Sequence, residues 1–293
     1  MTIALALGLV AAGCGSDDDK AADDTTTTAA AAKTPPVFEF HATDDAAGEH
    51  FKFSVPENVT GGAVTLKLVN DGKELHDLQL VKAAPGHTLA EFLKEFGSEE
   101  APVSEWIEAA GGVGGTPPGQ TNQVTLELEP GTYWYVCTES TEKGEKEISH
   151  ANSGMSGEIT IAGDSEASLP DTDASIVAKE YSFAPTGLKA GKNTFTFTNE
   201  GAQLHHAGIV PLMPGKTFAD AKAALTSQEE PTGPPPIDFE KSVFTAVVSG
   251  GKSMVVDATL AAGTYALLCF MPDKGTAGPP HVAKGMLVEL KVA

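Results

Sequence analysis

Cysteine is scarce in this sequence, with 3 residues in a chain of 293. Disulfide frameworks of secreted proteins use more cysteines and pair them within one domain. Cys14 lies near the N-terminus, and a bond between Cys137 and Cys269 would have to join equivalent strand ends in two halves of the chain. The sequence therefore argues against a disulfide framework. One metal-bound thiolate in each half is the better interpretation, and a single interdomain disulfide is the alternative.

Positive charge is scarce as well. The chain has 19 Lys and Arg residues against 40 Asp and Glu residues, and its formal net charge is -21. Such a surface repels phosphates and anionic headgroups, which argues against nucleic acid as a partner and against direct adhesion to anionic lipid. The charge suits a soluble, extracellular surface. It is also compatible with a basic redox or copper-exchange protein as partner.

Long hydrophobic runs are absent too, and the apolar run from Ile3 to Ala12 is too short to span a bilayer. It leads into Ala12, Gly13 and Cys14, small residues directly before a cysteine. This segment resembles a bacterial lipoprotein signal peptide, which implies that residues 1–13 are removed and that Cys14 is lipidated. An ordinary secretory signal is the alternative. Both interpretations predict export, and the first predicts a lipoprotein on the periplasmic or cell-surface side of a bacterial membrane.

Composition divides the rest of the chain into four parts. Residues 14–36 are rich in Asp, Thr and Ala and nearly devoid of large apolar residues, which predicts a disordered tether. Residues 37–162 have the composition of a globular domain. Residues 163–173 are polar, contain Pro170 and are interpreted as a linker. Residues 174–293 form the second predicted domain.

Apolar residues in both domains recur mainly with a period of two. The alternation is clear in residues 64–69 and 194–198, and Gly and Pro turns separate such segments. This pattern predicts half-buried antiparallel strands of β-sandwiches. Two segments, 88–96 and 217–225, instead have the amphipathic pattern of a helix and follow Pro-Gly. The sequence therefore predicts two all-β domains, each with a short helical insertion whose N-cap is Thr88 or Thr217.

The strongest signal is a set of His, Cys, His and Met that occurs twice in the same order. Asn-x-Gly precedes the first His in both copies, Gly-Thr-Tyr leads towards both Cys residues, and the second His and the Met are five apart with Gly before the Met. Two imidazoles, a thiolate and a thioether are the ligands of trigonal copper sites with a weak axial sulfur. The predicted metal ligands are His76, Cys137, His150 and Met155, and His205, Cys269, His281 and Met286.

These motifs resemble those of the cupredoxin family, whose members carry type 1 (blue) copper. The resemblance covers both domains almost end to end and implies two tandem Greek-key β-sandwiches. It also implies one copper per domain. The first His would follow a strand, and the other three ligands would come from one loop between the last two strands.

The loops between Cys and the second His are longer than in small blue-copper proteins. Twelve residues separate Cys137 from His150, and eleven separate Cys269 from His281. The first of these loops is highly charged, and we expect it to be mobile. His206 aligns with Asp77 and is predicted to be at the surface, because neighbours on a strand point to opposite faces. The remaining histidines are predicted to be solvated: His41, His50 and His87.

Catalysis by a copper cluster is not expected from the sequence. The chain has 8 His residues, no His-x-His motif, and no His beside Cys137 or Cys269. The cupredoxin resemblance makes multicopper oxidases and copper nitrite reductases the enzyme classes to consider. In these enzymes such histidines hold the catalytic copper or connect it to the type 1 copper. The sequence therefore predicts a protein that is not an enzyme.

Three functions without catalysis are compatible with the motifs. The favoured one is an electron carrier with a type 1 copper in each domain. The alternative is extracellular copper acquisition, storage or delivery, for which mobile loops would be useful. A scaffold that has lost its metal is less favoured, because the four residues are intact in both copies. The first two functions need the same ligands, so the sequence does not separate them.

Overall fold

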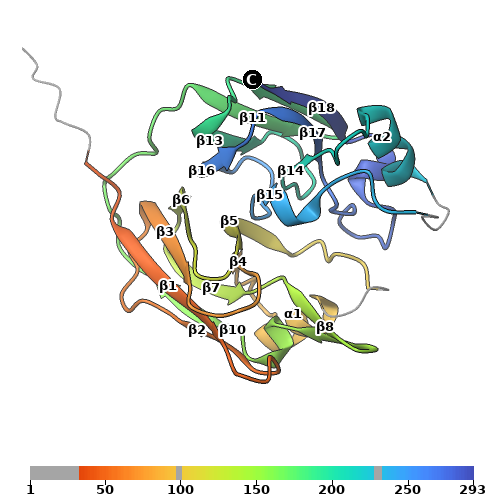
Figure 1. Ribbon diagram of the computed structural model, residues 1–293. Helices are drawn as coiled ribbons and strands as arrows, with labels where there is room; N and C mark the ends of the chain where they lie inside the picture. Colours follow the sequence, from red (N-terminus) through yellow and green to blue (C-terminus); the bar gives the residue numbers. More distant parts are fainter. Residues whose placement is uncertain (1–32, 97–100, 228–232) are drawn as a thin grey trace, which may run out of the picture. The chain divides into compact units, whose positions relative to one another are not determined.

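The computed structural model describes residues 33–96, 101–227 and 233–293 (Figure 1). The predicted signal peptide, Cys14 and the predicted tether up to residue 32 lie outside the described residues. Among the described residues, no helix combines the length and the apolar character needed to cross a bilayer.

The first part of the described chain contains ten strands, one α-helix and one short 3-10 helix. In chain order these are β1 (Val37–Asp44), β2 (Phe51–Ser54), β3 (Gly62–Asn70), β4 (His76–Lys82), α1 (Leu89–Phe96), β5 (Glu108–Thr116), β6 (Thr121–Leu128), β7 (Gly131–Val136), β8 (Ser140–Lys143), β9 (Lys146–Ser149), η1 (Ala151–Ser153) and β10 (Ser156–Ile161).

The second part repeats most of this order with eight strands, one α-helix and two 3-10 helices. They are β11 (Ala174–Lys179), β12 (Ser182–Thr186), β13 (Gly191–Asn199), β14 (Gly208–Pro211), α2 (Phe218–Thr226), η2 (Phe239–Lys241), β15 (Val243–Phe244), β16 (Ser253–Leu260), β17 (Gly263–Leu268), η3 (His281–Lys284) and β18 (Leu287–Val292).

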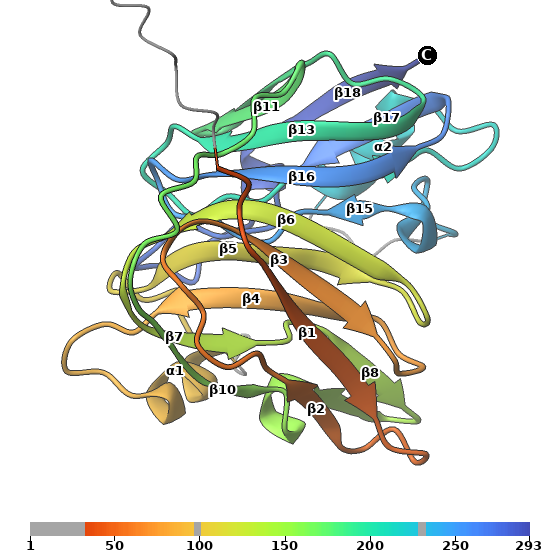
Figure 2. The ribbon, with the colours of Figure 1, turned by 90° about the vertical axis from the view of Figure 1, so that its left-hand side faces the viewer.

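Each domain is a sandwich of two sheets, and one of these sheets is shared. Strands of both domains form an eight-stranded sheet in the order β12-β11-β13-β16-β6-β3-β1-β2 (Figure 2). The second layer of the first domain is the four-stranded sheet β10-β7-β4-β5, and that of the second domain is β15-β14-β17-β18. The predicted fold class, two tandem β-sandwiches with helical insertions, is confirmed.

Two features of the sheets differ from the prediction or go beyond it. The predicted strands were all antiparallel, but β1 pairs with β3 and β11 pairs with β13 in parallel. The domains are joined by antiparallel pairing of β6 with β16, in which Val124 lies opposite Val256 and Leu126 opposite Met254. Because these side chains are buried, one continuous hydrophobic core extends through both sandwiches.

The two helices begin at the predicted threonines and cover the outer sheets. Thr217 Oγ1 accepts a hydrogen bond from Asp220 N, and Asp220 Oδ2 accepts one from Thr217 N, which forms a capping box. Phe92 of α1 packs on Val81 and Trp134 of the first domain, and Ala221 of α2 is part of the corresponding cluster in the second. The helices therefore stabilise the sheets that carry the candidate ligands.

Candidate metal centres

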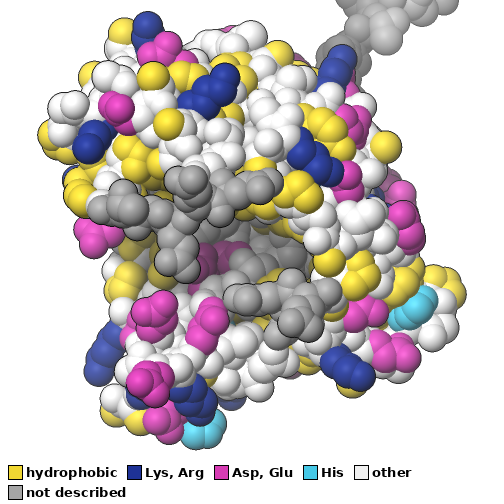
Figure 3. Space-filling model, turned by 90° about the vertical axis from the view of Figure 1, so that its right-hand side faces the viewer, with side chains coloured by type: hydrophobic (Ala, Val, Ile, Leu, Met, Phe, Trp, Pro, Cys, Tyr) yellow, Lys and Arg dark blue, Asp and Glu magenta, His cyan; other side chains and the backbone are white. Residues whose placement is uncertain are grey.

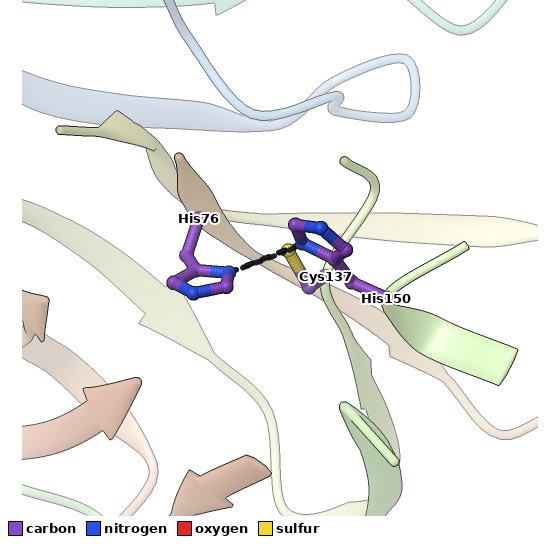
Figure 4. A group of neighbouring side chains, drawn as sticks. All are labelled: His76, Cys137 and His150. Carbon is purple, nitrogen blue, oxygen red and sulfur yellow. Dashed lines mark hydrogen bonds between the residues drawn. The ribbon is translucent and has the colours of Figure 1, made fainter. Parts of the chain in front are cut away.

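Three predicted ligands of the first domain lie together at one end of its sandwich (Figure 4). His76 begins β4, Cys137 follows β7, and His150 follows β9. His76 Nδ1 and His150 Nδ1 are 3.1 Å apart, and Cys137 Sγ lies 3.8 Å from the first nitrogen and 3.5 Å from the second. All three side chains are buried. The two imidazole nitrogens and the thiol sulfur thus lie close enough together to bind one metal ion.

The second domain has the same arrangement. His205 follows the loop after β13, Cys269 follows β17, and His281 begins η3. The two Nδ1 atoms are again 3.1 Å apart, and Cys269 Sγ lies 3.7 Å from His205 Nδ1 and 3.6 Å from His281 Nδ1. These side chains are also buried. Both cysteines are free thiols, so among the described residues the alternative of an interdomain disulfide does not occur.

The spacing of the donors fits a bound metal. Bonds to imidazole and thiolate in zinc proteins are about 2.0 and 2.3 Å long, and a trigonal metal with such bonds holds its donors roughly 3.5 to 3.7 Å apart. The separations in both domains are close to these values. Two imidazoles and a thiolate form a donor set that selects copper when a weak thioether completes it. Each domain thus contains one buried donor set that fits copper.

The methionines lie next to these sites. Met155 and Met286 are fully buried in the same core cluster as the two cysteines. Met155 O accepts a hydrogen bond from Cys137 N at 3.0 Å, and Met155 N donates to His150 O at 2.9 Å. Axial coordination by the methionines, like the coordinating role of the other six residues, stays a prediction.

The glycine before each methionine has a structural reason. Gly154 and Gly285 end the short helices η1 and η3 with positive φ angles of 117° and 101°. Side chains disfavour this conformation. At Gly154 a Cβ atom would also lie only 2.4 Å from Phe51 O. The glycine therefore lets the loop turn from the second His into the methionine.

The Asn-x-Gly motif fixes the loop before the first His of each site. Asn70 Nδ2 donates to Glu74 O and Thr116 O at 2.8 and 2.7 Å, and its Oδ1 accepts from Gly72 N. Asn199 makes the equivalent bonds to Gln203 O, Val248 O and Gly201 N. Both asparagines are buried. The motif therefore positions His76 and His205 through backbone hydrogen bonds.

A carboxylate beside each of these loops was not found from the sequence. Asp44 Oδ1 accepts from Lys73 N at 2.6 Å and from Glu74 N at 3.3 Å, and lies 3.3 Å from His76 Nε2. Glu180 Oε1 accepts from Ala202 N and Gln203 N at 2.5 and 2.7 Å and lies 3.5 Å from His205 Nε2. In each domain the acidic residue lies two positions after the alanine that pairs with the motif asparagine, Ala42 with Asn70 and Ala178 with Asn199. An acidic residue at this offset from the paired strand residue is the signal that could have indicated it.

The second His of each site also has an outer partner. His150 Nε2 lies 2.8 Å from Thr141 Oγ1, and His281 Nε2 lies 3.0 Å from Asp273 Oδ1. A partner at Nε2 that accepts a hydrogen bond keeps the proton on that nitrogen and leaves Nδ1 free to bind a metal. The outer partners therefore support Nδ1 coordination in both domains.

The loop between Cys137 and His150 is a β-hairpin. Strands β8 and β9 pair from Ser140 with Ser149 to Lys143 with Lys146, and Gly144 in the turn has a φ of 63°. Charged side chains on this hairpin are mostly exposed, whereas Ile148 is buried and packs into the core. The hairpin brings Thr141 against His150 and closes the site.

His206 is buried, so its predicted place at the surface is wrong. Its exposed fraction is 7%, and its Nε2 accepts a hydrogen bond from Phe270 N at 2.9 Å. Asp77, the equivalent residue, likewise accepts from Thr138 N at 2.5 Å. Alternation sends both residues away from the metal donors, but this face meets the other domain instead of solvent. Both residues therefore hold the backbone that follows the cysteine.

The other three histidines make surface contacts. His41 Nδ1 lies 2.7 Å from Asp71 Oδ2, and His50 Nδ1 lies 3.0 Å from Asp45 Oδ2. His87 stacks on Trp106 with ring centroids 4.2 Å apart. None of them belongs to the two metal-type clusters among the described residues.

Burial sets the protonation of the candidate ligands in the metal-free protein. It lowers the pKa of all four imidazoles, to about 4 for His150 and His205, where the neighbouring imidazole contributes as well. Burial raises the pKa of the Cys269 thiol to about 11 and that of Cys137 well above its ordinary value. Neutral imidazoles are ready to bind a metal, whereas each thiol must lose a proton.

Comparisons with known proteins identify similar copper proteins among solved structures. No protein-family model matches the chain, and no curated protein does. Auracyanin from Roseiflexus castenholzii is 20% identical with a TM-score of 0.29, and the match covers 44% of this chain and 98% of that one. Copper nitrite reductase from Nitrosomonas europaea is 19% identical with a TM-score of 0.25, over 89% of this chain and 94% of that one.

The resemblance to the cupredoxin family is confirmed in the structure by two β-sandwiches that each hold two imidazoles and a thiol. One expectation needs correction, namely that the chain is not an enzyme. A second copper nitrite reductase, from Thermus scotoductus, also matches 89% of this chain, at 16% identity, a TM-score of 0.24 and 62% coverage of that chain. With enzymes among the similar structures, the missing His-x-His motif does not exclude catalysis.

Proposed function

We propose that this chain is a copper protein that transfers single electrons, with one type 1 copper in each domain. The observation that carries the proposal is the repeated, prearranged set of two imidazoles and one thiol, buried in both domains. A site whose ligands are already in place lets a metal change oxidation state with little movement of the protein.

In this proposal the residues of each site have separate roles. His76, Cys137 and His150 would bind the metal of the first domain, and the bound copper would accept and release one electron. Asp44 holds His76 and the loop before it, and Thr141 holds His150. In the second domain Asp273 holds His281, and Glu180 holds the loop before His205 and lies 3.5 Å from His205 Nε2 without a hydrogen bond to it. These contacts limit the rotation of the imidazoles during electron transfer.

The closed form of the sites favours electron transfer over copper delivery. A delivery protein must release its metal, which requires a ligand to move away. Phe51 stacks on His150 with ring centroids 3.9 Å apart, and Tyr181 packs beside His281 with centroids 5.1 Å apart and an interplanar angle of 59°. These rings and the β8–β9 hairpin cover the imidazoles. Because the imidazoles are covered, they cannot easily move away from a bound metal, and this supports retention of the metal.

Electrochemistry combined with a metal-transfer assay tests this choice. We expect a reversible one-electron couple for each domain, rapid electron self-exchange, and slow transfer of copper to a competing chelator. Slow self-exchange together with ready loss of copper would favour acquisition, storage or delivery instead. A Thr141→Val variant serves as a probe, because it removes an outer hydrogen bond to His150 and keeps the side-chain volume.

We also propose that the protein is exported and anchored by lipid on Cys14 to the outside of a bacterial membrane. The basis is the small residues before Cys14 and the apolar run that precedes them. A Cys14→Ala variant should lose the anchor and be released or keep its signal. Intact mass of the native protein provides the measurement, and a free thiol at Cys14 would contradict the proposal.

A further inference from the structure

A cavity of about 570 Å³ lies between the two domains, and chain neighbours of the candidate ligands of both sites line it. Figure 3 shows a hollow on one face of the molecule, with hydrophobic and acidic side chains at its walls. Six lining residues lie one or two positions after a predicted ligand in the chain: Asp77 after His76, Thr138 and Glu139 after Cys137, His206 after His205, and Phe270 and Met271 after Cys269. A molecule in the cavity would therefore lie within one or two residues of both sites.

His206 offers a hydrogen-bond donor to this cavity. Its ring is more than nine-tenths buried, and Nε2 accepts from Phe270 N at 2.9 Å. In the neutral imidazole the other nitrogen, Nδ1, then carries the proton. No hydrogen-bond partner for Nδ1 is found within the part of the chain that the structure describes. An N–H group without a partner at a cavity wall is a site for an acceptor atom of a ligand.

Glu139 offers an acceptor to the same cavity. Its side chain is half-buried and makes no hydrogen bond or ion pair with any described residue. Asp77, by contrast, is already occupied by the amide and hydroxyl of Thr138. Glu139 is therefore the carboxyl group that remains free to bind a hydroxyl donor from a ligand.

The walls between these polar groups are apolar and partly aromatic. The rings of Phe244 and Phe270 lie 6.3 Å apart with an interplanar angle of 25°, and His206 lies 5.6 Å from Phe244. Val81, Phe92 and Ile107 line the cavity from the first domain. An apolar pocket of this size with a few polar groups is typical of small-molecule sites. The flat rings favour a flat ligand. Lysine and arginine are absent from the lining residues, so the cavity offers no cationic partner to an anion.

We propose that this cavity binds a neutral aromatic diol of the hydroquinone class, which serves as an electron donor to both copper sites. The ring packs against Phe244 and Phe270, one oxygen accepts from His206 Nδ1, and a hydroxyl donates to Glu139. Binding follows from the cavity alone. The redox step rests on the proposed function.

The redox step is balanced with two copper sites. Oxidation of one hydroquinone to the quinone releases two electrons and breaks two O–H bonds. Bound Cu(II) in the two sites would accept one of these electrons each, and the two protons would leave to water through the open side of the cavity. The number of electrons that the ligand gives therefore equals the number that the two sites accept.

Binding is tested first on the metal-free protein, by anaerobic calorimetry with 2,3,5-trimethylhydroquinone. We expect saturable binding with a dissociation constant below about 1 mM. The dimethyl ether of the same compound cannot donate hydrogen bonds and should bind about tenfold more weakly. Shifts of the backbone amide NMR signals of Phe244, Ala246 and Val247 locate the ligand in the wild-type protein. Absence of binding, equal binding of the ether, or shifts elsewhere would overturn the proposal.

Gly115 provides a variant pair that tests the position. A Cβ atom on this residue would lie 3.6 Å from Leu75 Cδ1 and 3.9 Å from Glu139 Oε1, at ordinary contact distance. Gly115→Leu should obstruct the cavity and weaken diol binding at least tenfold, whereas Gly115→Ala should leave it within about twofold of wild type. Equal binding by both variants, with unchanged circular dichroism, would overturn the proposed position.

The copper-loaded protein separates this inference from the proposed function. We expect one diol to reduce two blue sites and to yield one quinone. If copper does not bind but the diol does, the proposed function fails and the binding site stands. If both sites are blue and redox-active but the diol neither binds nor reduces them faster in wild type than in Gly115→Leu, the inference fails alone.

Discussion

Gln79 and Val247 are joined across the domain boundary by a pair of hydrogen bonds. Gln79 Nε2 donates to Val247 O at 3.0 Å, and Val247 N donates to Gln79 Oε1 at 2.8 Å. Gln79 lies three residues after His76, and Val248, the neighbour of Val247, pairs with His205 through two backbone hydrogen bonds. A continuous path of covalent and hydrogen bonds therefore connects the two candidate metal centres.

Removal of this pair should weaken the contact between the domains. Gln79→Leu leaves the amide and carbonyl of Val247 without partners, and we expect it to lower the free energy of unfolding by about 1–3 kcal/mol. Chemical denaturation provides the measurement. Gln123→Leu is the matched control, because Gln123 Nε2 makes an exposed interdomain hydrogen bond to Asp257 Oδ2 at 2.8 Å. A loss of stability no larger for Gln79→Leu than for Gln123→Leu would contradict the role of the pair.

Removal of the carboxylate behind His76 should weaken copper binding in the first domain. Asp44→Ala removes the acceptor for two loop amides and for His76 Nε2. Loss of such an outer partner typically costs 10–100-fold in metal affinity, so we expect about that loss at the first site and no change at the second. Competition with a copper chelator measures both affinities. Asp71→Ala, at an exposed contact with His41, is the control.

Substitution of the cysteine and substitution of the methionine should affect the copper site differently. Cys269→Ser should abolish the blue colour of the second site, because the intense absorption comes from charge transfer between thiolate and copper. Met286→Leu should keep copper and colour and raise the reduction potential, since a weak donor to Cu(II) is lost. Cys137 and Met155 should show the same contrast. Loss of binding in Met286→Leu with tolerance of Cys269→Ser would mean that the site is not type 1 copper.

Copper binding should depend on pH through the thiol proton. Because the pKa of Cys269 is about 11 in the metal-free protein, binding displaces one proton at every lower pH. His205, with a pKa of about 4, is neutral above pH 5 and releases none. The apparent affinity of the second site should therefore rise about tenfold per pH unit between about pH 5 and 9. Chelator competition over this range measures the slope, and a slope of zero would contradict a thiolate ligand.

Local patterns in the sequence predicted most of the fold and the ligand-type residues. Period-two alternation located the strands, Thr88 and Thr217 located the helices, and the repeated quartet located His76 and Cys137 at one site. Contacts between the domains were not predictable in this way. Alternation predicts a surface position for His206, because it distinguishes two faces of a strand but does not say which face another domain covers. The charged loop before His150 forms a hairpin that its charge pattern does not predict, with Gly144 in the turn and Ile148 buried.

Copper titration of the purified protein, followed by absorption spectroscopy and metal analysis, tests the central claim most directly. The expected result is two copper ions per chain with intense thiolate-to-copper absorption. We expect half of the absorption in Cys137→Ser or Cys269→Ser and none in the double variant. Copper retention that is undiminished in the double variant, or equal binding of zinc with no blue colour from copper, would contradict the assignment of two type 1 copper sites.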